Sequence, residues 1–152
     1  MSLIFRHLNN DLIKQISTWH DDEETRKRIS IHNLNDYYAY VSSRLDYFIW
    51  AVSDEDEIIG ELTAEIIGYK RVGISYIINP NMRNQGYCKR ILKEVIKLKE
   101  LTYTENFEAW VDSDNYPSIK CLEHIGFIRQ NVAPDENELF HYIFNRSKSA
   151  LM

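Results

Sequence analysis

The spacing of apolar and polar residues divides the chain into extended and helical segments. Alternation with a period of two predicts strands over residues 3–8, 47–53, 58–68, 74–79, 106–112, 128–133 and 139–145. Apolar residues three or four apart predict helices after residue 9, over 21–29, over 36–44, from 87 past 98, and over 115–126. The order strand, helix, strand across 74–112 implies a parallel pair with a right-handed crossover. Antiparallel strands flank this pair, so we expect a mixed sheet.

Two carboxylates share one face of the strand predicted over 58–68. Glu61, Thr63 and Glu65 alternate with Leu62 and Ala64, so the two sets lie on opposite faces. One interpretation is that the carboxylate face is simply exposed to solvent. The other is that it borders a reacting centre and supplies a base.

The segment before the first long strand is rich in charges and tyrosines. Residues 21–29 read DDEETRKRI, with acids first and bases last, which suits a solvated helix by its dipole. The alternative is an acidic lip for a basic substrate. Tyr37, Tyr38 and Tyr40 follow at a spacing typical of core or groove wall.

A polar loop with Arg83 and Gly86 joins the strand ending near Pro80 to a helix starting near Tyr87. The first amides of such a helix lack intrahelical partners and lie at the positive end of its dipole, which favours phosphate. One anion at a helix dipole gains only about 0.3–1 kcal/mol, so several donors must converge. Arg83, Lys89 and Arg90 add charge, and Gly86 permits close approach. The alternative is a turn glycine before a solvated helix start.

Length, composition, cysteine spacing and net charge limit the classes of protein to which this chain can belong. A chain of 152 residues with 44% apolar and 27% charged residues suits one domain with a real core. We find no apolar run of membrane-spanning length and no signal-peptide layout, so we expect a cytoplasmic protein. Cys88 and Cys121 stand apart from each other and from any histidine cluster, which predicts neither disulfide framework nor metal site. The net charge of −5 argues against nucleic acid and suits cationic substrates.

Two motifs carry a resemblance to a known family. The pattern R-x-x-G-x-C over 83–88 resembles the acyl-CoA pyrophosphate loop of the GNAT N-acetyltransferase superfamily, usually Q/R-x-x-G-x-G/A. The segment 115–127 resembles the GNAT signature N-x-x-S/A-x-x-x-Y/L-E-K-x-G-F through Asn115, Ser118, Leu122, Glu123, His124, Gly126 and Phe127. The motifs occur in the expected order, separated by one helix and one strand. The resemblance covers residues 47–127, and the first 46 residues match only in pattern.

The resemblance implies a single GNAT-like domain of the α/β (α+β) class over residues 1–152. Its mixed, mostly antiparallel, twisted sheet would have six to seven strands and about four helices, with a central parallel pair splayed into a V-shaped cleft. Residues 1–46 would form the first strand and the acceptor-side helices, 47–127 the acyl-CoA core, 128–145 the last strands and 146–152 a tail.

The resemblance also implies acetyl-CoA as the co-substrate, with no metal. Main-chain groups of Ile77 and Ile78 would bind the pantetheine arm, and Asn115 and Ser118 would touch its far side. The pyrophosphate would lie on the amides of the loop, which comprises Arg83, Asn84, Gln85, Gly86, Tyr87, Cys88 and Lys89.

The expected reaction is direct attack of a primary amine of a small molecule or peptide on the thioester. An amine with a pKa of about 10.4 is mostly protonated at neutral pH, a handicap of roughly 4–5 kcal/mol, so a base is required. Glu61 and Glu65 are the first candidates, followed by Asp112. Many family members place a tyrosine acid at the position of Leu122. Direct thiolate release, Tyr116 or Ser118 as substitute acid, or a non-catalytic acyl-CoA sensor or interaction module therefore all stay open, and a homodimer is compatible with each.

Overall fold

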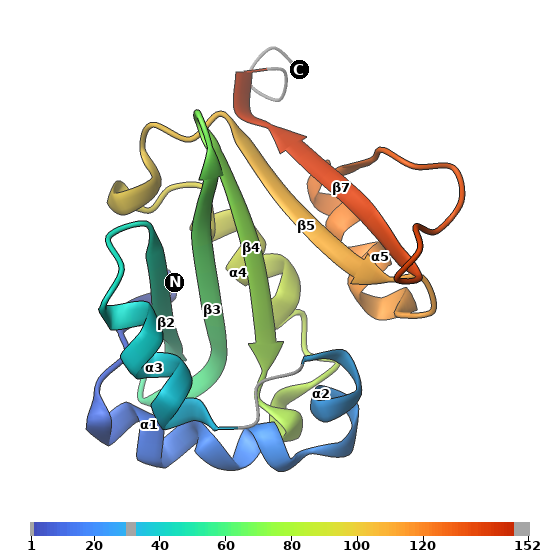
Figure 1. Ribbon diagram of the computed structural model, residues 1–152. Helices are drawn as coiled ribbons and strands as arrows, with labels where there is room; N and C mark the ends of the chain where they lie inside the picture. The colour runs from blue at the N-terminus through green and yellow to red at the C-terminus, as the bar shows by residue number, and fades with distance from the viewer. Residues whose placement is uncertain (1, 30–32, 148–152) are drawn as a thin grey trace. The chain divides into compact units, whose positions relative to one another are not determined.

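Seven strands form one sheet in this computed structural model, which describes residues 2–29 and 33–147 (Figure 1). Their order is β1-β2-β3-β4-β5-β7-β6. The strands are β1 (Ile4–His7), β2 (Tyr47–Asp54), β3 (Glu57–Gly68), β4 (Arg71–Ile78), β5 (Asn106–Asp112), β6 (Ile128–Arg129) and β7 (Leu139–Asn145). The described residues also form five α-helices: α1 (Asn10–Ile16), α2 (Glu23–Arg28), α3 (Leu34–Ser42), α4 (Tyr87–Val95) and α5 (Tyr116–Ile125). Three short 3-10 turns are η1 (Ser17–Asp21), η2 (Pro80–Met82) and η3 (Lys99–Leu101).

The pairing of the strands confirms the predicted mixed sheet. Strands β4 and β5 run parallel over three pairs, from Arg71↔Asn106 to Gly73↔Glu108. The pairs β1–β2, β2–β3, β5–β7 and β6–β7 are antiparallel. Seven strands with one parallel pair agree with the expected fold class, and the V-shaped cleft stays a prediction.

The chain forms two compact units. Unit 1 contains residues 1–65 and 75–87, and unit 2 contains residues 66–74 and 88–152. Both β3 and β4 contribute residues to each unit. The single domain over 1–152 therefore stays a prediction.

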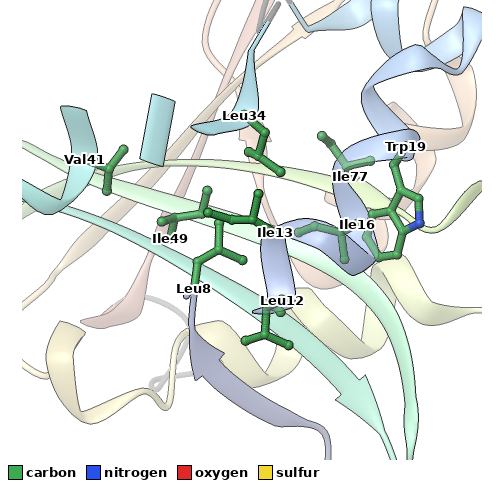
Figure 2. Packing of buried hydrophobic residues seen from close by; sticks show 10 residues of the cluster. Leu8, Leu12, Ile13, Ile16, Trp19, Leu34, Val41, Ile49 and Ile77 are labelled. Carbon is green, nitrogen blue, oxygen red and sulfur yellow. The ribbon is translucent and has the colours of Figure 1, made fainter. Parts of the chain in front are cut away.

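Apolar side chains of α1, η1, α3, β2 and β4, together with Leu8, form the core of unit 1. Ile16, which is fully buried, packs with Ile13, Trp19 and their neighbours (Figure 2). The remaining buried members are Leu8, Leu12, Leu34, Val41, Ile49, Ala51 and Ile77. Helix α1 begins where the Asn9 side chain accepts a hydrogen bond from Leu12 N at 2.9 Å. The predicted apolar face of this helix is thus confirmed.

In unit 2, one face of β5 and β7 packs on α5, which Figure 1 draws behind both strands. The Tyr142 hydroxyl donates to Glu123 Oε2 on α5 at 2.7 Å, and the Phe144 ring packs against Phe127. Burial and the bond to Glu123 raise the pKa of Tyr142 to about 12. Helix α5 ends at Gly126, whose φ of 110° favours glycine. The predicted helix end is confirmed.

Two predicted elements are shorter in the structure. The helix expected to run past Leu98 ends at Val95, because the chain tightens into i→i+3 hydrogen bonds before η3 and buries Leu101. The strand expected over 128–133 covers only Ile128–Arg129. There the Asn131 side chain bonds Ala133 O, Leu139 O and His141 N, so it replaces the strand ladder.

A buried carboxylate ties β4 to β5 beside their short parallel ladder. Glu108 is 1% exposed and accepts two hydrogen bonds from Arg71, Nε to Oε2 at 2.6 Å and Nη2 to Oε1 at 3.0 Å. It also contacts His141 Nε2 at 2.8 Å. The Arg71 guanidinium, and then His141, hold the pKa of Glu108 below its ordinary value.

Truncation of Ile16 should destabilise the protein strongly. Ile16→Ala removes buried methyl groups and leaves a cavity among the side chains of Figure 2, which costs about 2–5 kcal/mol in the free energy of unfolding. Urea unfolding measures this loss. Lys14→Ala, an exposed position of the same helix, is the control and should change stability by no more than about 0.5 kcal/mol. A loss below about 1 kcal/mol in Ile16→Ala would contradict the assigned packing.

Acid should destabilise the protein in part through Glu108. A carboxyl whose pKa is depressed in the folded state contributes stability that is complete above its unfolded pKa and lost as pH falls through its folded pKa. The free energy of unfolding should therefore decline below about pH 4.5. Glu108→Gln should show a shallower decline in urea unfolding between about pH 3 and 6. The exposed Glu136→Gln serves as control, and parallel declines in all three proteins would refute the idea.

Candidate active site

The loop between β4 and α4 has backbone angles typical of an anion-binding turn. Asn84 and Gly86 have φ of 64° and 82°, in the left-handed region. A Cβ built on Gly86 meets no heavy atom within 4 Å, so the backbone angle, and not crowding, favours glycine here. Asn84, Gln85 and Gly86 are exposed. Successive backbone N–H groups in a turn that includes left-handed residues can form a concavity that binds anions.

Both ends of this loop are anchored within unit 1. Arg83 Nη2 donates to Asp22 Oδ2 at 2.6 Å and to Thr25 Oγ1 at 3.2 Å. Asp22 also caps α2 by accepting from Thr25 N at 3.0 Å, and the hydrogen bond from Arg83 lowers its pKa. At the other end, the Tyr87 hydroxyl donates to Asp54 Oδ2 at 2.9 Å. Asp22, one acid of the 21–29 segment, thus holds the loop through its ion pair with Arg83 and is not a purely solvated side chain.

The side chain of Ile77 belongs to the core of unit 1, and it is 7% exposed. Ile78 is half-buried. At Ile77, therefore, only the main-chain atoms are available to contact a ligand.

The two carboxylates of β3 lie in different surroundings. Glu61 is 1% exposed, and its Oε2 lies 2.9 Å from Nε2 of His20, which is also buried. Among the described residues, Glu61 Oε1 and His20 Nδ1 have no hydrogen-bond partner. Glu65 is half-buried opposite Tyr47 in the β2–β3 register. The interpretation of a wet face is therefore wrong for Glu61.

His20 could not be found from the sequence, because it is 41 residues from Glu61 and belongs to no motif.

The tyrosines of α3 lie close to the same face of β3. The Tyr37 and Tyr47 hydroxyls are 2.5 Å apart and their rings meet edge to face. Burial and the bond to Tyr47 raise the pKa of Tyr37, which also hydrogen-bonds Thr63. Tyr37 also packs against the core of unit 1, so of the two expected roles, core or groove wall, the structure supports the first.

A polar hollow of about 550 Å³ lies at the surface of unit 1. Residues 15–22 and 79–81 form it together, a pairing that no local sequence pattern indicates. Its lining comprises Gln15, Thr18, Trp19, Asp21, Asp22, Asn79, Pro80 and Asn81. Asp21 is exposed there, whereas Asp22 is already bound by Arg83.

The second motif places its residues at the start of α5, in unit 2. Asn115 is the N-cap, Ser118 is half-buried and Tyr116 is 65% exposed. Leu122 is 1% exposed, so this position supplies apolar packing and no hydroxyl. Tyr116 therefore offers an accessible hydroxyl near the motif.

The two cysteines also lie in unit 2. A hydrogen bond to Cys88, together with burial, raises the pKa of Cys121, which disfavours the thiolate that a nucleophile needs. Cys88 is half-buried and Lys89 is exposed. The buried Cys121 thiol is therefore not suited to act as a nucleophile.

Within residues 2–29 and 33–147, no three acidic, histidine or cysteine side chains gather as metal ligands would. Nor does any helix there have the length and apolar character needed to cross a membrane.

Comparison with known proteins identifies the family of this chain and several similar proteins. Residues 2–128 match the family described as Acetyltransferase (GNAT) domain. The chain is 28% identical over 134 residues to the uncharacterized N-acetyltransferase YfmK of Bacillus subtilis (strain 168), covering 88% of this chain and 90% of that protein.

Solved structures show the same fold. Spermidine N-acetyltransferase from Vibrio cholerae, in complex with CoA and spermine, superposes with a TM-score of 0.84 at 16% identity, over 98% of both chains. Aminoglycoside acetyltransferase AAC(6')-Ib in complex with coenzyme A gives 0.83 at 14% identity, over 99% of both. With the family match over most of its length, this chain belongs to the GNAT acetyltransferase family and is an acetyl-CoA-dependent N-acyltransferase.

Proposed function

We propose that the protein transfers the acetyl group of acetyl-CoA to a primary amine of a small molecule or peptide by direct attack. The observation that carries the proposal is the Arg83–Lys89 segment, whose left-handed Asn84 and Gly86 precede α4 in a chain of the GNAT family. The exposed amides of this turn would hold the pyrophosphate.

The Arg83–Asp22 contact supports a loop that is preorganised for its ligand. A loop held at both ends loses less conformational freedom on binding than a mobile one, so less binding free energy is spent on ordering it. Because Arg83 is partly occupied by Asp22, backbone amides would carry most of the contact with phosphate. Main-chain groups of Ile77 and Ile78 would bind the pantetheine arm along β4.

The acceptor is proposed to be cationic. The net charge of −5 favours association with cations over anions. The structural relatives named above include a spermidine and an aminoglycoside acetyltransferase, both enzymes of amine-bearing substrates. The exposed Asp21 would add attraction for a cation near the hollow of unit 1.

Proton transfer has several candidate groups. Glu65 is the more accessible carboxylate of β3, whereas Glu61 would act only through His20. Asp112, at the end of β5, is half-buried. We propose Tyr116 as the acid for the departing thiolate, because its hydroxyl is exposed and Leu122 has none.

Leu122 also favours a second candidate function, a non-catalytic acyl-CoA sensor or interaction module. A buried leucine cannot protonate a thiolate. In this case CoA would bind without turnover.

A panel of amine acceptors should distinguish the two functions. Purified protein with acetyl-CoA and each of a polyamine, an aminoglycoside, a lysine peptide and a free peptide N-terminus should release CoA thiol with at least one acceptor. A thiol reagent measures the release, and the thermal unfolding temperature with and without CoA measures binding. Stabilisation by CoA without acceptor-dependent release favours the sensor. Neither stabilisation nor release would exclude both.

Replacement of Gly86 should weaken CoA binding. Gly86→Val places a β-branched residue at a φ of 82°, a strain of about 1–3 kcal/mol, or about 5- to 150-fold in the dissociation constant. Calorimetric titration with CoA measures the change. Glu138→Val is the matched control, because Glu138 has a φ of 62° in a turn outside the loop. Unchanged affinity in Gly86→Val would refute the loop assignment.

A further inference from the structure

The polar hollow of unit 1 is built from two segments of that unit. Gln15 of α1, the turn η1 and Asp22 supply one set of lining residues, and the segment 79–81 after β4 supplies the other. The volume of about 550 Å³ lies within the range of small-molecule sites, roughly 300–1,000 Å³. All of the lining residues belong to unit 1, so the hollow depends on the packing of that unit alone.

Two neighbouring carboxylates in the hollow keep oxygen atoms free to accept hydrogen bonds. Asp21 is exposed and makes no hydrogen bond or ion pair with another described side chain. At Asp22, the bonds from Arg83 Nη2, Thr25 N and Thr25 Oγ1 all end on Oδ2. Within residues 2–29 and 33–147, Oδ1 of Asp22 therefore has no partner. Oxygen atoms of this kind attract a cation.

The carboxylates suit an ammonium group better than a divalent metal ion. Such an ion takes about six or more oxygen ligands, and in the described part of the chain no three acidic, histidine or cysteine side chains gather around one point. An ammonium group needs fewer partners, because it donates only three hydrogen bonds. Arg83 offsets the charge of Asp22 in part, so Asp21 supplies most of the attraction.

The indole N–H of Trp19 opens into the hollow. Trp19 packs with Ile16 in the core and is 7% exposed, and in Figure 2 its nitrogen lies on the side of the ring away from Ile16. The fully buried side-chain atoms that lack a hydrogen-bond partner are His20 Nδ1, Glu61 Oε1 and Arg146 Nε. Nε1 of Trp19 is not among them, and no described residue accepts from it, so it is reached from solvent. Since Trp19 lines the hollow, its N–H is directed there.

This donor sets a second requirement for the ligand. A largely buried tryptophan usually bonds its N–H to a partner, so an unpaired one indicates a place for an acceptor atom. An ammonium group only donates hydrogen bonds and cannot serve, whereas a hydroxyl oxygen accepts them. The ligand that matches the hollow thus carries an ammonium group and a hydroxyl oxygen close together.

We propose that the hollow binds a hydroxylated amine, with its ammonium group at Asp21 and Oδ1 of Asp22 and a hydroxyl oxygen at the indole N–H of Trp19. As a site for the acetyl acceptor, it rests on the proposed function. An ammonium group beside carboxylates is held in its charged form, which has no lone pair for attack. The amino group bound here is therefore an anchor, and the acceptor carries a second amino group that reacts.

Two matched diamines test the site without acetyl-CoA. The probes 1,3-diaminopropan-2-ol and 1,3-diaminopropane differ only in a hydroxyl group. Calorimetric titration of the full chain should give an affinity about 2- to 10-fold higher for the hydroxylated diamine, because one hydrogen bond contributes about that much. Asp21→Asn should weaken the binding of both by about 1.5- to 5-fold. Glu23→Gln, an exposed acid of the same segment outside the hollow, is the matched control and should change neither affinity.

Removal of the indole N–H should abolish the preference for the hydroxyl group. Trp19→Phe keeps an aromatic ring in the core and removes the donor, so the two diamines should bind with equal affinity. Trp110→Phe, a tryptophan of unit 2, is the control and should keep the wild-type preference. Thermal unfolding checks that each variant is folded. Because Asp21 is exposed, Asp21→Asn keeps the proposal testable if the Trp19 variant unfolds.

The outcomes separate this inference from the proposed function. No binding of either diamine to the wild type, equal affinities in the wild type, or an unchanged preference in folded Trp19→Phe would each overturn the hollow as the site. If the diamines bind as expected and the acceptor panel releases no thiol, the proposed function fails and the binding site stands. If the panel gives turnover, Asp21→Asn should raise KM for the acceptor more than it lowers kcat. An unchanged KM would overturn the role of Asp21 as an anchor and leave the proposed function intact.

Discussion

The carboxylate of Glu108 is the point at which three strands of unit 2 are joined. It is almost fully buried, and a buried charge is stable only where donors surround it. Arg71 from β4 supplies two donors and His141 from β7 supplies one, so Glu108 on β5 binds both neighbouring strands. The parallel ladder between β4 and β5 is only three pairs long, and this ion pair supports it from the side.

A second constraint is the backbone of the loop before α4. Left-handed conformations at Asn84 and Gly86 direct the chain from β4 into the helix, and such conformations are costly for most side chains. The contacts of Arg83 with Asp22 and of Tyr87 with Asp54 hold this turn from both ends. Strain that is held by surrounding contacts is typical of binding sites. Under the proposed function, a loop held in this way would bind the pyrophosphate without rearrangement.

The burial of Glu61 shows how far periodicity can predict a site. The alternation of β3 correctly separates Glu61, Thr63 and Glu65 from Leu62 and Ala64. It cannot say which face is covered, because both faces of an inner strand can be buried. Tyr37 from α3 and His20 from η1 reach the polar face from segments distant in sequence. Two of its members, Glu61 and Thr63, are therefore buried, and the carboxylate nearest to solvent is Glu65.

Local chemistry in the sequence determined the main elements and the family of this protein. The periodicity of apolar residues, the cap at Asn9, the stop at Gly126 and the two motifs all act over a few residues, so they can be read without coordinates. The end of α4 at Val95 and the shortness of β6 were decided by buried Leu101 and by the Asn131 side chain. The pairs His20–Glu61 and Glu108–His141 join residues 41 and 33 positions apart. Only tertiary packing can bring such groups together, because no local preference connects them.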